Sequence, residues 1–130
     1  MNVNVLMLLT PKASVTYVFS KDTIEDAAKT VRLSGYTSVP VLEDDGRYAG
    51  SLSEGDLLWD MMDNSGDDLK RPVSEIVNRE KNAAVHVDVT MDVLTGRVLN
   101  QNYVPVIDDR GFFIGIVTRR DVMGHLLKER

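Results

Sequence analysis

The sequence predicts an α/β (α+β) protein built from two tandem β-α-β-β-α units that pack with pseudo-twofold symmetry. The first reason is that the second half of the chain repeats the first half at a shift of 65 residues. The second reason is that each half alternates runs of β-branched residues with an apolar periodicity typical of helices. A unit of about 60 residues buries only a modest core and usually needs a partner face, so we expect the two units to pack against each other.

The repeat keeps proline, glycine and aspartate in register. Val39-Pro40-Val41 falls on Val104-Pro105-Val106, and seven of the 26 positions between 37–62 and 102–127 are identical. The other identical pairs are Asp44 with Asp109, Gly46 with Gly111, Gly50 with Gly115 and Asp56 with Asp121. Because these residue types shape turns and helix ends, their agreement indicates one shared fold.

The first unit, residues 1–62, is expected to begin with a packing or interface segment, the apolar run 5–9. A helix opening at Asp22 or Thr23 places Ile24, Ala27 and Val31 on one face, and Gly35 stands where it can end that helix. Gly46 supplies the positive φ that a tight turn often requires. The other expected elements are strands 15–19, 39–42 and 48–52 and a helix 54–62 whose apolar side carries Leu57, Leu58, Met61 and Met62.

The second unit, residues 73–130, repeats this order after a polar linker, residues 63–72. Pro72 is placed to start a short helix 73–77 at its first position. A helix begins at Thr90 and a final helix at Thr118. The expected strands are 84–87, 104–107 and 113–117.

Composition excludes several classes of function. The chain has no cysteine, which rules out disulfides, cysteine-ligated zinc, iron–sulfur clusters and a thiol nucleophile. Its formal net charge of −5 disfavours nucleic-acid binding. The apolar segments are too short to span a bilayer, so we expect no membrane partner and a cytoplasmic location. His86 and His125 share no metal-ligand spacing, and we expect no metal site.

One motif, Gly-h-h-Ser/Thr-x-x-Asp with h apolar, occurs at residues 115–121 and also at residues 50–56, where Ser51 stands at one of the apolar positions. Each copy lies where a strand becomes a helix, and amides at a helix N-terminus attract anions such as phosphate. A carboxylate there can accept hydrogen bonds from a ribose diol. The same residues also fit a helix capping box, so a purely structural role stays open.

The repeated unit with this motif, a hydrophobic-Pro-Val segment and an acidic glycine turn resembles the CBS domain, and two in tandem resemble a CBS pair, or Bateman module. The resemblance covers nearly the whole chain, so we expect no separate catalytic domain. Residues 54–59 and 99–106 are similar to small stand-alone CBS-pair proteins of Gram-positive bacteria.

The resemblance implies which residues bind the ligand. Asp56 and Asp121 would bind ribose hydroxyls, and Ser53 and Thr118 would contact ribose or phosphate. The adenine pocket would be lined by residues at and before the two hydrophobic-Pro-Val segments, namely Thr37, Ser38, Asn102, Tyr103, Val104 and Pro105.

Charge distinguishes the two copies of the motif. Arg119 and Arg120 lie in the second copy, whereas the first copy carries no cation. Because phosphate favours arginine, we expect the nucleotide in the Asp121 cleft. Both arginines would equally suit a solvated surface. The Asp56 cleft is expected to be weaker, empty, or shared by a diadenosine ligand across a dimer.

The resemblance further implies a regulatory sensor of adenine nucleotides that is not an enzyme and needs no obligatory cofactor. The ligand would be AMP, ADP, ATP or cyclic di-AMP, which the sequence does not rank. A homodimer would signal by its conformation to an unknown protein target. Two alternatives stay open: a structural dimerisation protein with vestigial pockets, and an enzyme acting on nucleotides, for which the sequence offers no catalytic constellation.

Overall fold

The computed structural model describes residues 4–64 and 68–128, and these residues form two compact units. One unit is Thr16–Lys81; the other combines residues 82–128 with residues 4–15. The units expected from the sequence, residues 1–62 and 73–130, differ from the units of the structure in two segments. Residues 4–15 pack with the second unit, and residues 73–81 pack with the first. The expected first unit, linker and second unit include residues 1–3, 65–67 and 129–130, respectively, which lie outside the described residues.

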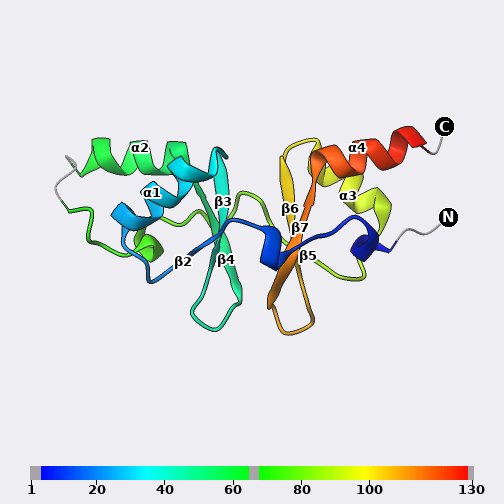
Figure 1. Ribbon diagram of the computed structural model, residues 1–130, viewed down its shortest axis with the longest axis horizontal. Coiled ribbons are helices and arrows are strands. Elements are labelled where there is room, and N and C mark those ends of the chain that lie inside the picture. The colour runs from blue at the N-terminus through cyan, green and yellow to red at the C-terminus, as the bar shows by residue number, and fades with distance from the viewer. Residues whose placement is uncertain (1–3, 65–67, 129–130) are drawn as a thin grey trace. The chain divides into compact units, whose positions relative to one another are not determined.

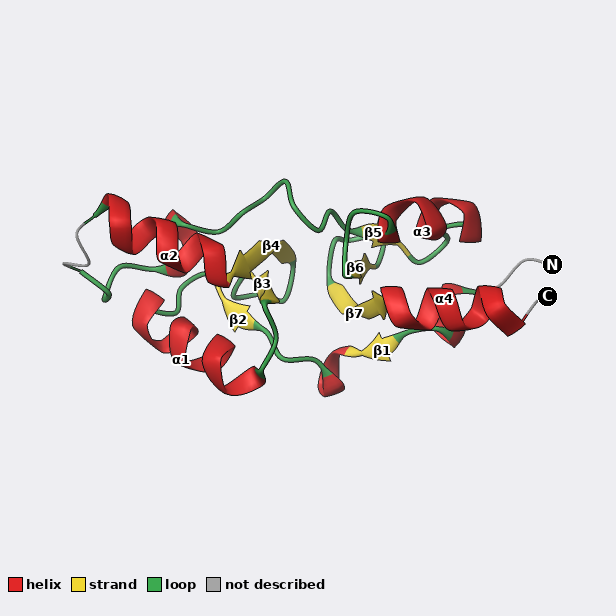
Figure 2. Cartoon of the chain, turned by 90° about the horizontal axis from the view of Figure 1, so that it is seen from above, coloured by secondary structure: helices red, strands yellow, loops and turns green. Residues whose placement is uncertain are grey.

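The unit Thr16–Lys81 has the expected β-α-β-β-α order. Its strands form a three-stranded sheet in the order β2-β3-β4, with β2 parallel to β3 and β3 antiparallel to β4. Both helices lie on one side of this sheet (Figures 1 and 2). The elements are β2 (Val18–Phe19), α1 (Ile24–Ser34), β3 (Ser38–Leu42), β4 (Tyr48–Ser53) and α2 (Glu54–Asp63).

Local sequence signals account for the ends of α1. The Thr23 hydroxyl accepts a hydrogen bond from the Asp26 amide at 3.1 Å, which caps the helix. Gly35 ends it in the left-handed conformation, with φ of 75°. The predicted helix with its N-cap and terminal glycine is confirmed. Expected strand 15–19 is shorter, because only Val18 and Phe19 pair with β3.

The other unit repeats the order and adds one strand from the N-terminal segment. Its four-stranded sheet has the order β1-β7-β6-β5, and β1 pairs antiparallel with the outer edge of β7. Helices α3 and α4 cover one side (Figure 2). The elements are β1 (Thr10–Pro11), β5 (Val85–His86), α3 (Met91–Val98), β6 (Tyr103–Ile107), β7 (Phe113–Thr118) and α4 (Arg119–Lys128). Thus the predicted mixed α/β fold is confirmed.

Each unit has its own apolar core between its helices and its sheet. In the first unit, Val31 of α1 packs with Val39 and Val41 of β3 and Leu52 of β4. In the second, the corresponding residues are Val98, Val104, Val106 and Val117. Val5, in a short 3-10 helix (Val5–Met7), is buried in this second core. The N-terminal run is therefore a packing segment of the unit that is distant in sequence.

In each unit, a glycine in a strand allows the backbone of another segment to approach closely. These glycines are Gly50 in β4 and Gly115 in β7. Gly50 and Gly115 have φ of 155° and 156°, values that residues other than glycine rarely adopt. A Cβ on Gly115 would lie 2.2 Å from the Thr10 carbonyl oxygen, and one on Gly50 would lie 2.4 Å from the Asn78 carbonyl oxygen. Both hairpins also show a register shift directly after the residue that pairs with this glycine.

Two helical expectations differ from the structure. Pro72 is the N-cap residue of a 3-10 helix, Val73–Glu75, and not the first residue of a helix 73–77. The extended backbone of Pro72 forms an isolated antiparallel β-bridge with Thr23, which holds the start of the 3-10 helix beside the start of α1. In α2, Leu57 is half-buried, but Leu58, Met61 and Met62 are exposed. Hence most of the apolar side of α2 is not covered by the described chain.

A buried ion pair anchors the chain after the linker. The Asp60 carboxylate, on α2, accepts two hydrogen bonds from Nη2 of Arg71, at 2.8 Å and 2.7 Å. It also accepts one from the side-chain amide of Asn64. The hydrogen bond from Arg71 to Asp60 raises the pKa of this guanidinium. Nearby, the Lys70 ammonium lowers the pKa of the Glu25 carboxyl by hydrogen bonding and charge. The pairs direct the segment 68–71 back along α1 and α2.

Substituting Gly115 by alanine is expected to lower the free energy of unfolding by about 2–4 kcal/mol, because the new Cβ strains the backbone and displaces β1. Gly96→Ala is the control, since Gly96 lies in α3 and a Cβ there meets nothing within 4 Å. This control should gain up to about 1 kcal/mol from helix propensity. Urea unfolding of both variants measures the difference; equal stability would contradict the crossing constraint.

Candidate functional site

The first copy of the motif forms a closed hydrogen-bonded cap. The Ser53 hydroxyl accepts from the Asp56 amide at 3.0 Å, and the Asp56 carboxylate accepts from the Ser53 amide at 2.9 Å. This is the reciprocal capping box of α2. One Asp56 oxygen is therefore engaged in holding the helix start.

The second copy leaves its carboxylate open. The Thr118 hydroxyl accepts from the Asp121 amide at 3.0 Å, as Ser53 does for Asp56. Across residues 4–64 and 68–128, however, the Asp121 carboxylate accepts no hydrogen bond and forms no ion pair. Asp121 is half-buried at the start of α4. The equivalent aspartates thus differ in what their side chains can still bind.

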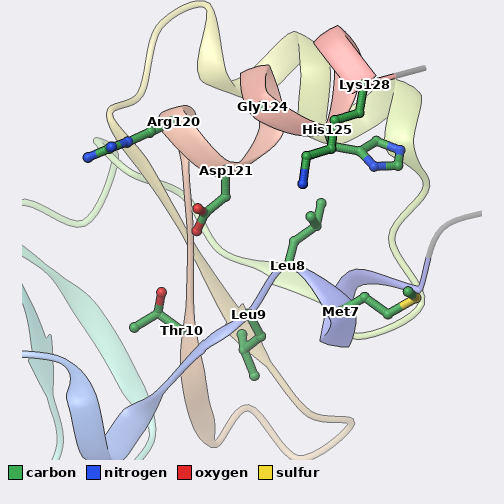
Figure 3. A pocket seen from close by; sticks show the side chains of 9 residues that line it. All are labelled: Met7, Leu8, Leu9, Thr10, Arg120, Asp121, Gly124, His125 and Lys128. Carbon is green, nitrogen blue, oxygen red and sulfur yellow. The ribbon is translucent and has the colours of Figure 1, made fainter. Parts of the chain in front are cut away.

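Asp121 lines a hollow of about 690 Å³ that lies within one unit. One wall is the N-terminal segment, residues 7–10, and the other is α4. Figure 3 shows the Asp121 carboxylate directed from α4 toward Thr10, whose hydroxyl points back into the same space. The lining residues are Met7, Leu8, Leu9, Thr10, Arg120, Asp121, Gly124, His125 and Lys128.

The helix wall of this hollow combines one anionic group with cationic groups. Asp121 lies in the first turn of α4, and Lys128 lies two turns further along this helix. In Figure 3 the Lys128 amine lies on the side of α4 that faces Leu8, whereas Arg120 extends away from the hollow. The amides at the start of α4 add a partial positive charge. This arrangement suits a ligand with hydroxyl groups at one end and anionic groups beside them.

Arg119 has a structural partner that the sequence did not reveal. Its Nε donates a 2.7 Å hydrogen bond to the carbonyl oxygen of Val98, the last residue of α3. Its backbone amide donates to the Asn102 carbonyl at 2.9 Å. An arginine at this position satisfies an orphan carbonyl and complements the negative end of the helix dipole. Arg119 and Arg120 therefore have different surroundings, although they are adjacent in sequence.

The residues expected around adenine are placed by the sheet hairpins. Asn102 and Thr37 are exposed at the start of β6 and β3, and each carbonyl accepts from the first amide of the following helix. Ser38 is half-buried, and Tyr103 and Pro105 are buried. Val104 is fully buried in the core, so its side chain packs with apolar neighbours. Of the expected ligand residues, only Arg120 and Asp121 line the hollow.

Sequence reasoning did not place residues 7–10 and the second half of α4 at this site. The available signal was Gly115 in a strand interior, which indicates close approach of another backbone. That signal does not identify which segment approaches. A further hollow, of about 380 Å³, lies between Asn4 and residues 87–91 and contains no motif residue.

The searched part of the chain, residues 4–64 and 68–128, contains no cluster of three or more histidine, aspartate or glutamate residues that could hold a metal ion. None of its helices is both long and apolar enough to cross a membrane.

Comparison with known proteins identifies the family. The CBS domain family model matches residues 8–63 and again residues 73–128. An uncharacterized protein of Methanocaldococcus jannaschii is 26% identical over 126 residues. That match covers 95% of this chain and 44% of the relative, so the chain spans less than half of the relative's length.

Solved structures share the fold over nearly the whole chain. A hypothetical conserved protein from Geobacillus kaustophilus matches with a TM-score of 0.85 and 28% identity, over 100% of both chains. CbpB in complex with c-di-AMP matches with a TM-score of 0.89 and 19% identity, over 97% of this chain and 85% of that one. CBSX2 in complex with AMP matches with a TM-score of 0.78 and 23% identity, over 95% and 96%. The expected likeness to small Gram-positive CBS-pair proteins is confirmed.

Arg119→Ala is expected to lower the free energy of unfolding by about 1 kcal/mol, because the last carbonyl of α3 loses its partner. Arg120→Ala, which removes an exposed neighbouring cation, should change it by less than about 0.5 kcal/mol. Thermal unfolding of the two variants without ligand tests this difference. Equal effects would show that the contact between Arg119 and Val98 contributes nothing to stability.

Proposed function

Because the chain belongs to the CBS domain family, we propose that it is a regulatory module that binds an adenine nucleotide in the hollow beside Asp121. The observation that carries this proposal is the Asp121 carboxylate. It lines a hollow of about 690 Å³ and has no hydrogen-bond partner within the described residues. Hollows of this size accommodate small-molecule ligands.

The chemistry of the hollow supports a nucleoside phosphate. A free carboxylate can accept two hydrogen bonds from a ribose diol, and such charge-assisted bonds are strong. The Thr10 hydroxyl faces Asp121 (Figure 3) and can bond to the same sugar. The partial positive charge at the start of α4 favours an anionic group such as phosphate near Asp121. Leu8 and Leu9 add an apolar wall.

The difference between Asp56 and Asp121 favours one nucleotide site per chain. Asp56 is the repeat equivalent of Asp121, but its carboxylate accepts a hydrogen bond from the Ser53 amide. A ligand that used Asp56 would share or break this bond. No arginine or lysine accompanies Asp56 in its motif. We therefore assign the ligand to Asp121.

The known relatives narrow the candidate ligands. CbpB was solved with c-di-AMP and CBSX2 with AMP, so AMP, ADP, ATP and c-di-AMP are the first ligands to test. A bound ligand can shift a conformational equilibrium only to the extent that its affinity differs between the two conformations. In our proposal the ligand acts on a homodimer, which passes the signal to a protein target and catalyses no reaction itself.

The exposed side of α2 supports the homodimer. Trp59 and Met62 are 59% and 64% exposed, and Leu58 and Met61 lie beside them on the same helix. Clustered exposed apolar side chains are typical of interaction surfaces. A self-associating surface on α2 would bury these residues, which the described chain leaves uncovered.

Asp121→Asn should weaken adenine-nucleotide binding by about 1.5–3 kcal/mol, the usual loss for hydrogen bonds to a charged group. Asp56→Asn is the matched control: it weakens the α2 cap but should leave the affinity unchanged. Isothermal titration with AMP, ADP, ATP and c-di-AMP measures both. If folded Asp121→Asn binds as tightly as the parent chain, the site assignment is wrong. If the folded parent binds none of the four, the structural alternative is favoured.

Met62→Lys is expected to shift the chain toward monomer, raising the dimer dissociation constant at least tenfold, because a charge would enter an apolar interface. Leu33→Lys is the control, since Leu33 is 87% exposed on α1 and lies outside the α2 surface. Sedimentation analysis over a concentration series gives both constants. A parent chain that is monomeric at high concentration would refute the dimer proposal.

A further inference from the structure

Gly124 leaves a stretch of α4 without side chains inside the hollow. It lies in the middle of a ten-residue helix, although glycine is the poorest helix former after proline. A Cβ at Gly124 would meet nothing within 4 Å, so packing within the described chain does not require glycine here. Instead, Gly124 is a lining residue of the hollow.

The residues about one helical turn before and one turn after Gly124 carry opposite charges. Asp121 precedes it by three residues and Lys128 follows it by four, so all three share one face of α4. His125 lines the hollow beside them. Seven residues of helix place Asp121 and Lys128 about 10 Å apart along the axis. Figure 3 shows the space between them open over Gly124, with Leu8 on the opposite wall.

We propose that this open stretch over Gly124 is a second phosphate subsite, in which Lys128 binds a phosphate group beyond the first. The ligand class is then an adenosine compound with at least two phosphate groups, preferred over AMP. This inference rests on the proposed function, since Asp121 must hold the ribose. The first phosphate would lie between Asp121 and Gly124, and Lys128 would bind the second.

The charges of the hollow agree with this assignment. Lys128 lies about 10 Å from Asp121 along the helix axis, too far to bind the single phosphate of AMP when Asp121 holds the ribose, so Lys128 has no role in binding AMP. A second phosphate adds negative charge, and Lys128, which lines the hollow two turns beyond Asp121, can offset it. A side chain at position 124 would project into the path between the two subsites.

The test compares AMP with ADP, ATP and c-di-AMP by isothermal titration without added divalent cations. A ligand with a second phosphate should bind the parent chain about tenfold tighter than AMP, a modest factor because Lys128 is exposed. Lys128→Ala should remove this advantage without changing the affinity for AMP, and Lys128→Arg should retain most of it. An advantage for ADP and ATP would identify a linear polyphosphate, and one for c-di-AMP a cyclic dinucleotide.

Gly124→Leu provides a second, steric test. It should abolish the advantage of the second phosphate, whereas Gly96→Leu, at an open helical position outside the hollow, should not. Thermal unfolding without ligand establishes that both variants fold. Equal affinity for AMP and for every ligand with a second phosphate would overturn the subsite while leaving the proposed function intact. Loss of all adenine-nucleotide binding in the parent chain would instead overturn the proposed function.

Discussion

The close backbone crossing at Gly50 and Gly115 is the constraint on which the rest of the structure depends. At each site a carbonyl oxygen of another segment occupies the place of a Cβ. At Gly115 this crossing adds β1 to the sheet and brings residues 7–10 beside α4. The hollow exists because its two walls, distant in sequence, are held together there. Glycine at position 115 is therefore required by the close packing of this unit.

The two copies of the motif share one helix cap but differ in the hydrogen bonding of their aspartates. Both hydroxyls cap a helix in the same way, which explains why serine and threonine are interchangeable there. The aspartates differ: Asp56 completes a capping box, whereas the Asp121 carboxylate accepts no hydrogen bond within residues 4–64 and 68–128. Helix α2 thus has the more complete N-terminal cap. The open carboxylate beside cationic groups makes the second unit the better place for an anionic ligand.

The positions of the elements were largely predictable, because they depend on short-range chemistry. Thr23, Gly35 and Ser53 each act at a helix end through groups only a few residues away. The extent of the strands was less predictable, since only two residues of expected strand 15–19 find a pairing partner. At the candidate site, Asp121 and Arg120 could be identified from the motif. Gly124, His125 and Lys128 could not, because the motif ends before them.

The sequence by itself determined the repeated β-α-β-β-α order, the helix caps and the identity of the key aspartates, because these follow from periodicity and from neighbours along the chain. Tertiary structure alone decided which segment approaches Gly115, that Arg119 binds the end of α3, and which of the two motif aspartates has no partner within the described part of the chain. Each of these outcomes depends on groups brought together from distant positions. Residues 4–15 join the second unit because its exposed strand edge and apolar core accept them, a choice that local propensity does not encode.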